Sequence, residues 1–239
     1  MKRVARWFGI LLVLLAIAAG YVYYTAFSHS SAIVDGQELV QGVKTIKDSF
    51  VSVFVVDAGG GKVVLIDAGR DKHADAIRAE LGRRKLDDSA VAAIFLTHGH
   101  GDHTGAAKQF PSAAVYALSA EVARVGDDAK IAHPLSDGEK TTVGEATIET
   151  FAVPGHTAGS AVFLTQGVLF FGDSAGAGKD GKLMAAVSMF STNSAQNVSS
   201  LKAFYARLQP REGEIKKLAF AHTGPLDGLG PLADFARTP

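Results

Sequence analysis

An apolar segment runs directly into a histidine-rich loop in the stretch Ala93-Ile94-Phe95-Leu96-Thr97-His98-Gly99-His100-Gly101-Asp102-His103. The loop places four metal-ligand side chains within six residues: His98, His100, Asp102 and His103. Its glycines allow the backbone to turn tightly around a small object. Imidazole and carboxylate groups bind Zn²⁺, and also Fe or Mn, and a chain without cysteine offers no sulfur ligand. The alternative is a polar loop whose histidines only cap backbone groups, and so dense a set of ligands argues against it.

Three further apolar segments end in a metal-ligand residue in the same way. Residues 150–155 lead into His156, residues 168–172 into Asp173, and residues 218–221 into His222. Loops that follow strands commonly build functional sites. Each of these residues alone has a weak claim, because an Asp at the end of a strand is often a cap or turn residue. Together with the first loop, they predict one metal centre assembled at the carboxyl ends of four strands.

The four segments resemble the motifs of the metallo-β-lactamase superfamily of metallohydrolases. The resemblance rests on residues 97–105, 154–160, 171–173 and 221–222, in that order and with similar separations, and covers most of residues 36–239. It implies a mixed α/β (α+β) fold, an αββα sandwich with the site on one rim.

The resemblance also implies a set of ligands. One metal would be held by His98, His100 and His156, and another by Asp102, His103 and His222, with Asp173 bridging them. Two Zn²⁺ ions per chain are expected, with Fe or Mn as alternatives. The resemblance further implies that Asp67 supports the site from the end of its strand. The alternative for Asp67 is a turn-forming role before Ala-Gly.

The expected chemistry is hydrolysis of a small-molecule substrate. Two cations that share a carboxylate can hold a water as hydroxide near neutral pH and polarise the substrate oxygen. Direct attack by metal-bound hydroxide needs no serine, cysteine or lysine nucleophile. Asp102 is the candidate catalytic residue, which orients that hydroxide or accepts its proton. We therefore predict a metal-dependent hydrolase that cleaves an ester, thioester, lactone or related bond.

Departures from individual subfamilies narrow this prediction. No Cys stands near Asp173, which excludes the zinc lactamases that need one and leaves β-lactam hydrolysis as an alternative. Only 17 residues follow His222, which argues against glutathione thioesters, whose hydrolases append a helical domain. Lactonases often carry a Tyr beside the metals, and between Asp173 and His222 this chain has only Tyr205. Alternatives of another class are an iron-dependent redox enzyme resembling a sulfur dioxygenase and a non-catalytic membrane-associated module.

The rest of the body alternates strand and helix patterns. Apolar and β-branched runs predict strands at residues 50–56, 62–66, 92–96, 114–117, 146–153, 160–165, 168–171 and 217–221. Helical patterns cover residues 72–86, 119–125 and 195–208, with Ser119 as the expected N-cap of the second. This alternation predicts one mixed α and β domain with many strands.

Other polar and apolar candidates have ordinary structural explanations. Surface positions are expected for His29, His73 and His133. Residues 191–194 and Asn197 would cap the late helix or face the substrate. The core or the wall of a pocket is expected for Phe170, Met184, Met189 and Phe190.

The charge pattern excludes a nucleic-acid substrate and predicts a membrane anchor. Basic and acidic residues balance at 24 each, and no basic cluster runs along the body. A basic cytoplasmic segment, residues 1–6, precedes 18 uncharged, mostly apolar residues at 7–24. We expect residues 7–24 to be a transmembrane anchor, 25–35 a linker, and 36–239 a periplasmic or extracellular catalytic domain. The alternative is a cleaved signal peptide, favoured by Ala16-Ile17-Ala18, which would leave the protein secreted.

Overall fold

The computed structural model describes residues 7, 8, 10, 12–15, 17, 20, 21, 24 and 28–238. Contacts divide the chain into two units, residues 1–30 and residues 31–239. The described positions from 7 to 24 are helical, and no helix among the described residues is long and apolar enough to span a bilayer. Residues 1–6, 25–27 and seven positions of the expected anchor (9, 11, 16, 18, 19, 22 and 23) lie outside the described residues. The anchor, the signal peptide and the linker therefore stay predictions.

The second unit contains all the strands described below. They are β1 (Glu38–Val40), β2 (Val43–Asp48), β3 (Val51–Asp57), β4 (Val63–Ile66), β5 (Val91–Phe95), β6 (Ala114–Leu118), β7 (His133–Leu135), β8 (Lys140–Val143), β9 (Ala146–Ala152), β10 (Ala161–Thr165), β11 (Val168–Phe170), β12 (Ala175–Ala177), β13 (Leu183–Ala185), β14 (Lys217–Ala219) and β15 (Leu226–Asp227). The α-helices are α2 (Asp75–Arg83), α3 (Gly101–Thr104), α4 (Val122–Val125), α5 (Ser194–Leu208) and α6 (Gly230–Arg237).

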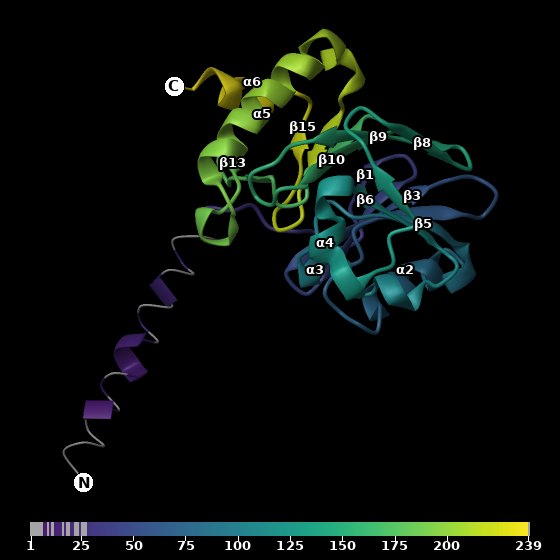
Figure 1. The fold of residues 1–239 in the computed structure, drawn as a ribbon, viewed down its shortest axis with the longest axis horizontal. Helices are drawn as coiled ribbons and strands as arrows, with labels where there is room; N and C mark the ends of the chain where they lie inside the picture. Colours follow the sequence, from purple (N-terminus) through teal and green to yellow (C-terminus); the bar gives the residue numbers. More distant parts are fainter. Residues whose placement is uncertain are drawn as a thin grey trace. The chain divides into compact units, whose positions relative to one another are not determined.

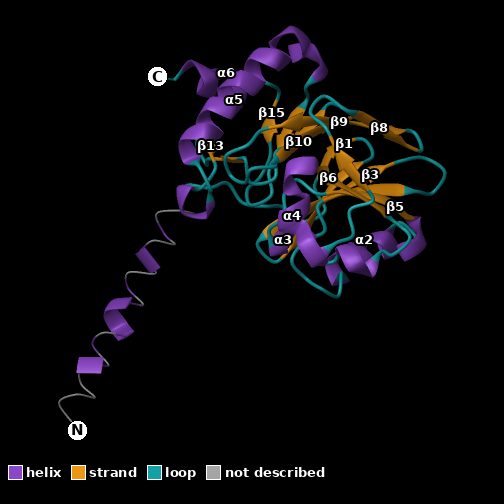
Figure 2. Ribbon diagram, viewed as in Figure 1, coloured by secondary structure: helices purple, strands orange, loops and turns teal. Residues whose placement is uncertain are grey.

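Within residues 31–238, the strands form two large sheets with helices on both outer sides (Figures 1 and 2). The first sheet has the order β1-β2-β3-β4-β5-β6-β7 and the second β15-β14-β11-β10-β9-β8, while β12 pairs with β13 separately. Pairing is antiparallel from β1 to β4 and parallel from β4 to β7. Helices α2, α3 and α4 lie along the first sheet, and α5 and α6 along the second (Figure 2).

Apolar clusters fill the spaces between these layers. Successive side chains of a strand point to opposite faces, so β3 contributes Val53 and Val55 to the core under α2, and Phe54 and Val56 to the core between the sheets. A further cluster joins the outer face of the second sheet to α5 and α6. A strand that is buried on both faces reads as a continuous apolar run, as β3 does. The layers confirm the predicted αββα sandwich.

All the predicted strands are present, with ends within two residues of those expected, and the helices at 72–86 and 195–208 correspond to α2 and α5. The predicted N-cap role of Ser119 is wrong. Ser119 lies inside a 3₁₀ turn, Ser119–Glu121, and its hydroxyl donates instead to the carbonyl oxygen of Leu135 at 3.0 Å. The sequence reasoning missed several elements: β1, β2, β7, β8, β12, β13, β15, α3 and α6.

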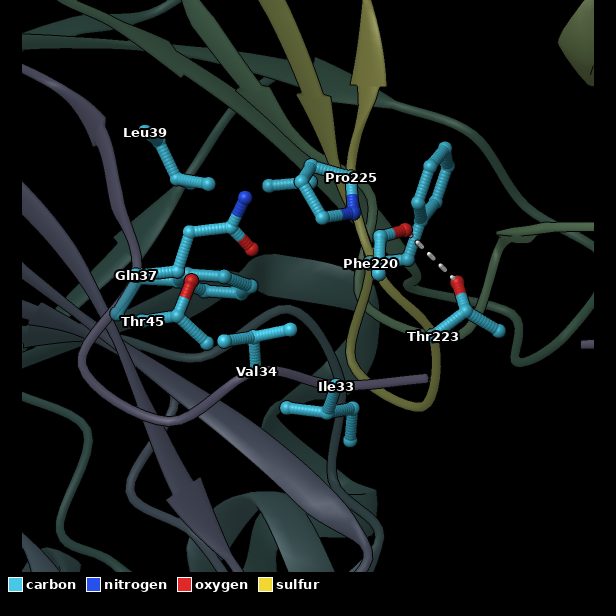
Figure 3. A pocket seen from close by; sticks show the side chains of 11 residues that line it. Ile33, Val34, Gln37, Leu39, Thr45, Phe220, Thr223 and Pro225 are labelled. Carbon is cyan, nitrogen blue, oxygen red and sulfur yellow. Dashed lines mark hydrogen bonds between the residues drawn. The ribbon is translucent and has the colours of Figure 1, made fainter. Parts of the chain in front are cut away.

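A small cavity lies between residues 33–45 and the loop that precedes β15 (Figure 3). Gln37, Thr45, Thr223 and Pro225 are among the residues that line it, and Thr223 donates a hydrogen bond to the carbonyl oxygen of Gly224 at 3.3 Å. The volume of about 10 Å³ leaves room for a single water molecule at most. The cavity is therefore a packing gap and not a substrate site.

Candidate metal centre

The predicted ligands lie where the carboxyl ends of strands from both sheets meet. In the first sheet, β5 leads into the loop and short helix α3 that carry His98, His100, Asp102 and His103. In the second sheet, β9, β11 and β14 lead to His156, Asp173 and His222. Backbone hydrogen bonds join the sheets at this edge, from Ala161 to the Thr97 carbonyl (2.8 Å) and from Ser52 to the Ala221 carbonyl (2.7 Å). Within the described residues, the seven side chains form two adjoining groups that could each hold a metal ion.

His98, His100 and His156 turn three ring nitrogens toward one point. Nε2 of His98 lies 3.0 Å from Nδ1 of His100 and 3.2 Å from Nε2 of His156. The third separation, from His156 Nε2 to His100 Nδ1, is 3.1 Å. Nitrogens bonded to a tetrahedral Zn²⁺ at about 2.0–2.1 Å lie roughly 3.3 Å from one another. The spacing of the three imidazoles therefore suits one such ion.

Asp173 connects this group to the second one through its two carboxylate oxygens. Oδ2 lies 3.5 Å from Nε2 of His156 and 3.9 Å from Nε2 of His98. Oδ1 lies 3.2 Å from Nε2 of His103 and 3.1 Å from Nε2 of His222. Both Oδ1 and His103 Nε2 are buried, and neither has a well-aligned hydrogen-bond partner among the described residues. Buried polar atoms are nearly always satisfied, so this pair suits a shared cation between them.

Asp102 completes the second group from its open side. Its Oδ2 lies 3.4 Å from Nε2 of His222 and 4.0 Å from Nε2 of His103. The side chain of Asp102 is 24% exposed, whereas that of Asp173 is 14% exposed and that of Asp67 only 1%. Of the carboxylates that face the ligand groups, Asp102 is thus the one most open to solvent.

Hydrogen bonds on the far side of the rings fix which nitrogen faces the centre. Nδ1 of His103 donates to Asp67 (2.8 Å), and Nδ1 of His222 donates to the carbonyl oxygen of Phe50 (2.9 Å). Carboxylate and carbonyl oxygens only accept, so both Nδ1 atoms carry hydrogen, and each Nε2 is the nitrogen that can bind a metal. Asp67 is fully buried and also accepts from the backbone and hydroxyl of Thr97. The supporting role implied for Asp67 is therefore the one that the structure shows.

The same logic applies to the first group. The Thr97 hydroxyl donates to Asp67, so it accepts from Nδ1 of His98 at 3.1 Å. The Ser191 hydroxyl donates to the carbonyl oxygen of Val187, so it accepts from Nδ1 of His156 at 3.3 Å. In His98 and His156, as in His103 and His222, Nδ1 therefore carries the hydrogen, and Nε2 is the nitrogen that can bind a metal.

The two groups differ in how readily their imidazoles take up protons. Burial lowers the pKa of His98 well below its usual range and lowers the pKa of His156 to about 4. Burial also opposes protonation of His222, but the nearby carboxylates of Asp173 and Asp102 outweigh it and raise its pKa to about 10. For His103, the attraction of Asp67 and Asp173 likewise outweighs burial and raises the pKa. Near neutral pH, metal binding to the second group therefore displaces protons from His103 and His222. The imidazoles of His98 and His156 are already neutral.

Of the other candidates from the sequence, Ser191 supports His156 as described above, and those considered next lie away from the ligand atoms or serve the fold. Asn193 caps α5 by accepting from the backbone of Gln196 at 3.0 Å. Asn197 is fully buried and bonds the backbone of Ala186 and Ser174, so it is structural. Phe170 lies in the core and Met184 is half-buried, but Met189 and Phe190 are 62% and 52% exposed, so a core position is wrong for these two. Exposed positions are confirmed for His29, His73 and His133.

Sequence reasoning missed two residues beside the centre. Glu121, almost fully buried, binds the backbone of Gly99 and the side chain of Thr157. Phe50 is 51% exposed, and its ring stacks against that of His222 at 5.7 Å. Neither residue belongs to a motif, because both reach the centre through the tertiary fold. The only signal for Glu121 was the presence of glycines beside His98 and after His156.

The sequence profile of the metallo-beta-lactamase superfamily matches residues 46–222. The chain belongs to this superfamily. The family resemblance drawn from the motifs is thereby confirmed. The chain is similar to the hydroxyacylglutathione hydrolase of Halorhodospira halophila, with 31% identity over 170 residues, 70% of this chain and 62% of that relative. It is 29% identical over 203 residues to the enzyme of the same name from Thermosynechococcus vestitus, covering 79% of this chain and 73% of that one.

Solved structures show the same fold at lower identity. A metallo-beta-lactamase family protein from Thermus thermophilus has a TM-score of 0.63 at 20% identity, and the match covers 83% of the present chain and 79% of the Thermus chain. A B3 metallo-beta-lactamase with an active-site glutamic acid has a TM-score of 0.65 at 20% identity, covering 87% and 88%. At this identity the likeness extends to the fold alone.

The sequence match to the hydroxyacylglutathione hydrolase of Halorhodospira halophila spans less than two thirds of that protein's length.

Proposed function

We propose that this protein is a dinuclear zinc hydrolase that cleaves a small-molecule thioester, ester or lactone bond. The position of Asp173 carries the proposal, because its two oxygens face two separate groups of ligand side chains. The ordered Nδ1 contacts behind four of the imidazoles support it, since they present metal-binding nitrogens toward the centre.

These contacts suggest a role for each residue around the site. Metals bound here would supply an activated water and polarise the substrate carbonyl. Asp67 and the Phe50 carbonyl hold His103 and His222 in register. Asp102, on the open side, accepts the proton that the attacking water releases. The exposed ring of Phe50 gives the acyl part of a substrate an apolar surface beside His222.

Among the candidate bonds we place the thioester first. The support is the set of curated relatives that carry the name hydroxyacylglutathione hydrolase at 29–31% identity. β-Lactam hydrolysis stays as a comparison reaction, because the B3 metallo-beta-lactamase described above is only 20% identical to this chain.

Elemental analysis and a substrate panel test the proposal on the full-length protein. The panel contains an acyl thioester, an aryl ester, an acyl lactone, a β-lactam and a phosphodiester. We expect two equivalents of zinc per chain, with the acyl thioester cleaved fastest. One equivalent of iron together with oxygen consumption would instead support the redox alternative. A protein that binds no metal and cleaves none of the substrates would contradict the proposal.

We further propose that residues 7–24 stay attached and anchor the catalytic domain outside the cytoplasm. The uncharged run and the preceding Lys2, Arg3 and Arg6 support this orientation. Mass spectrometry of the protein isolated from native membranes tests it. An intact N-terminus is expected, and a mature chain beginning at Ala19 would show a cleaved signal instead.

A further inference from the structure

Glu121 is a buried carboxylate that lies behind the first ligand group without touching its imidazoles. It ends the 3₁₀ turn Ser119–Glu121, and only 1% of it is exposed. Oε1 accepts from the backbone N–H of Gly99 at 2.9 Å, and Oε2 accepts from the Thr157 hydroxyl and the Gly159 N–H, each at 2.9 Å. The side chain therefore joins two loops that come from different sheets.

These two loops carry the whole three-histidine group. Gly99 stands between His98 and His100, and Thr157 directly follows His156. The ring nitrogens of the three histidines approach one another to 3.0–3.2 Å across the gap between the loops. A shift of either loop would open these separations, so the carboxylate sets the distance between ligands that it does not contact.

The glycines show that the contact is built closely. A Cβ at Gly99 would lie 2.8 Å from the backbone nitrogen of Val125, and a Cβ at Gly159 would lie 2.5 Å from that of Glu121. Only glycine leaves room for the segment from Glu121 to Val125 at both loops. Arg124 approaches Oε1 of the carboxylate at 3.3 Å and offers it a balancing charge.

We propose that Glu121 is a positioning residue that holds the three-histidine group at metal-binding distance by clamping its two loops. The inference rests on the proposed metal binding of that group. Every group that faces the carboxylate in the described contacts is a donor, so glutamine cannot replace it: its amide –NH₂ would oppose either the Gly99 N–H or the donors of residues 157 and 159.

Competition between the protein and a chelator for Zn²⁺ tests the proposal in two backgrounds. His222→Ala leaves the three-histidine group intact, and His98→Ala leaves the second group intact. Adding Glu121→Gln should weaken Zn²⁺ binding about 10–100-fold in the first background, the usual loss for a residue that supports a ligand. In the second background we expect a change of less than threefold.

Further variants separate positioning from general stability. Thr157→Val, which keeps the packing but removes the hydroxyl, should weaken Zn²⁺ binding in the first background, and Thr157→Ser should restore it. These variants also serve if Glu121→Gln does not fold. Glu80→Gln is the matched control, because Glu80 is an equally buried carboxylate of α2 that binds Arg83 and the following Arg84, and it should leave Zn²⁺ affinity unchanged.

The outcomes are distinct. Unchanged Zn²⁺ affinity in the Glu121→Gln and Thr157→Val proteins, or equal weakening in both backgrounds, would overturn the clamp while leaving the proposed function intact. A wild-type protein that binds no Zn²⁺ would overturn both.

Discussion

Asp173 and Asp102 are carboxylates of the same cluster with different surroundings. Asp173 is 14% exposed and faces both ligand groups, whereas Asp102 is 24% exposed and faces only the second. Burial alone would raise the pKa of Asp173, but the attraction of His103 and His222 outweighs it and lowers that pKa well below the usual range. Asp173 is therefore ionised near neutral pH, which suits a ligand. Asp102 lies where a proton can leave to solvent, which suits an acceptor.

Replacing Asp173 should disable both metal positions together. In Asp173→Ala each ion loses a negatively charged ligand, and two cations in one site then repel without a shared anion between them. We expect fewer than two equivalents of zinc and a loss of hydrolysis of at least about 100-fold, the upper figure for losing a residue that only supports a ligand. Elemental analysis and kinetics on the same sample check this. His73→Ala and His133→Ala, both on the surface, are the controls and should change neither quantity. Retention of two tightly bound metals by Asp173→Ala would show that the bridge is not needed.

Replacing Asp102 by asparagine should lower turnover more than substrate binding. The amide still offers an oxygen to a metal, but it cannot accept a proton, so the pocket is kept while the reaction loses its base. We expect kcat per bound zinc to fall by about 10²–10⁴-fold with KM little changed, the mark of an interaction made mainly in the transition state. If kcat per bound zinc were close to normal, Asp102 would be a ligand without a catalytic role.

At the scale of elements, strands with a continuous apolar run could be predicted, whereas strands whose apolar residues are few or interrupted by polar ones could not. β3, with the sequence Val-Ser-Val-Phe-Val-Val-Asp, is buried on both faces, so its apolar run stands out. β8 is Lys-Thr-Thr-Val, whose Thr and Val favour a strand but which is too short and too polar to form an apolar run, and β7 contains Pro134. These strands form because neighbours in the sheet supply their hydrogen bonds, which no local pattern encodes.

The candidate site divides along the same line. His98, His100, Asp102 and His103 could be predicted because they share one loop, and Asp67 could be inferred from the family motif. Glu121 could not, because its partners Gly99 and Thr157 are more than 20 residues away along the chain. The orientation of His222 by the Phe50 carbonyl spans 172 residues and is visible only in the fold.

The end of β11 approaches the end of β5 so closely that only glycine fits there. Gly172 has φ of 53°, and a Cβ on it would lie 2.3 Å from the hydroxyl of Thr97, which supports Asp67 and His98. Gly60 has a similar φ of 58°, but a Cβ added there would meet open space. Gly60→Ala therefore measures only the free-energy cost of placing alanine in this backbone conformation. We expect Gly60→Ala to destabilise the protein by about 1–2 kcal/mol and Gly172→Ala by roughly 1–3 kcal/mol more. Unfolding in urea measures both. Equal losses of unfolding free energy in the two variants would mean that Thr97 moves away from the added Cβ of Gly172→Ala without an energetic cost.

At the scale of the whole molecule, the cluster connects the two sheets of the sandwich. His98, His100, Asp102 and His103 follow β5 of the first sheet, whereas His156, Asp173 and His222 follow strands of the second. Each ligand group takes side chains from both sheets. Bound metals would therefore join elements that are otherwise linked mainly by the core between the sheets, and their removal should be felt as a loss of stability of the entire domain.

Zinc removal should lower the thermal unfolding midpoint, and the difference should widen as pH rises. In the metal-free protein, His222 has its pKa raised from 6.5 to about 10, so its protonation contributes stability that is fully present below pH 6.5 and is lost as pH rises toward 10. Zinc replaces that proton, so it binds more tightly as pH increases, and the zinc-bound form does not lose this stability.

A ligand present at 100–1,000 times its Kd stabilises by about 2.7–4.1 kcal/mol, which corresponds to a Tm difference of roughly 5–15 °C for a domain of this size.

His156 acts in the opposite direction at low pH. Its pKa, lowered to about 4, favours the folded metal-free protein above pH 6.5, and this stability is lost as pH falls toward 4. Calorimetry of zinc-loaded and chelator-treated protein from pH 6.5 to pH 9 should therefore show a gap that grows steadily. A gap that stayed constant or narrowed with pH would mean that zinc does not displace the proton of His222, and that the second ligand group is not filled.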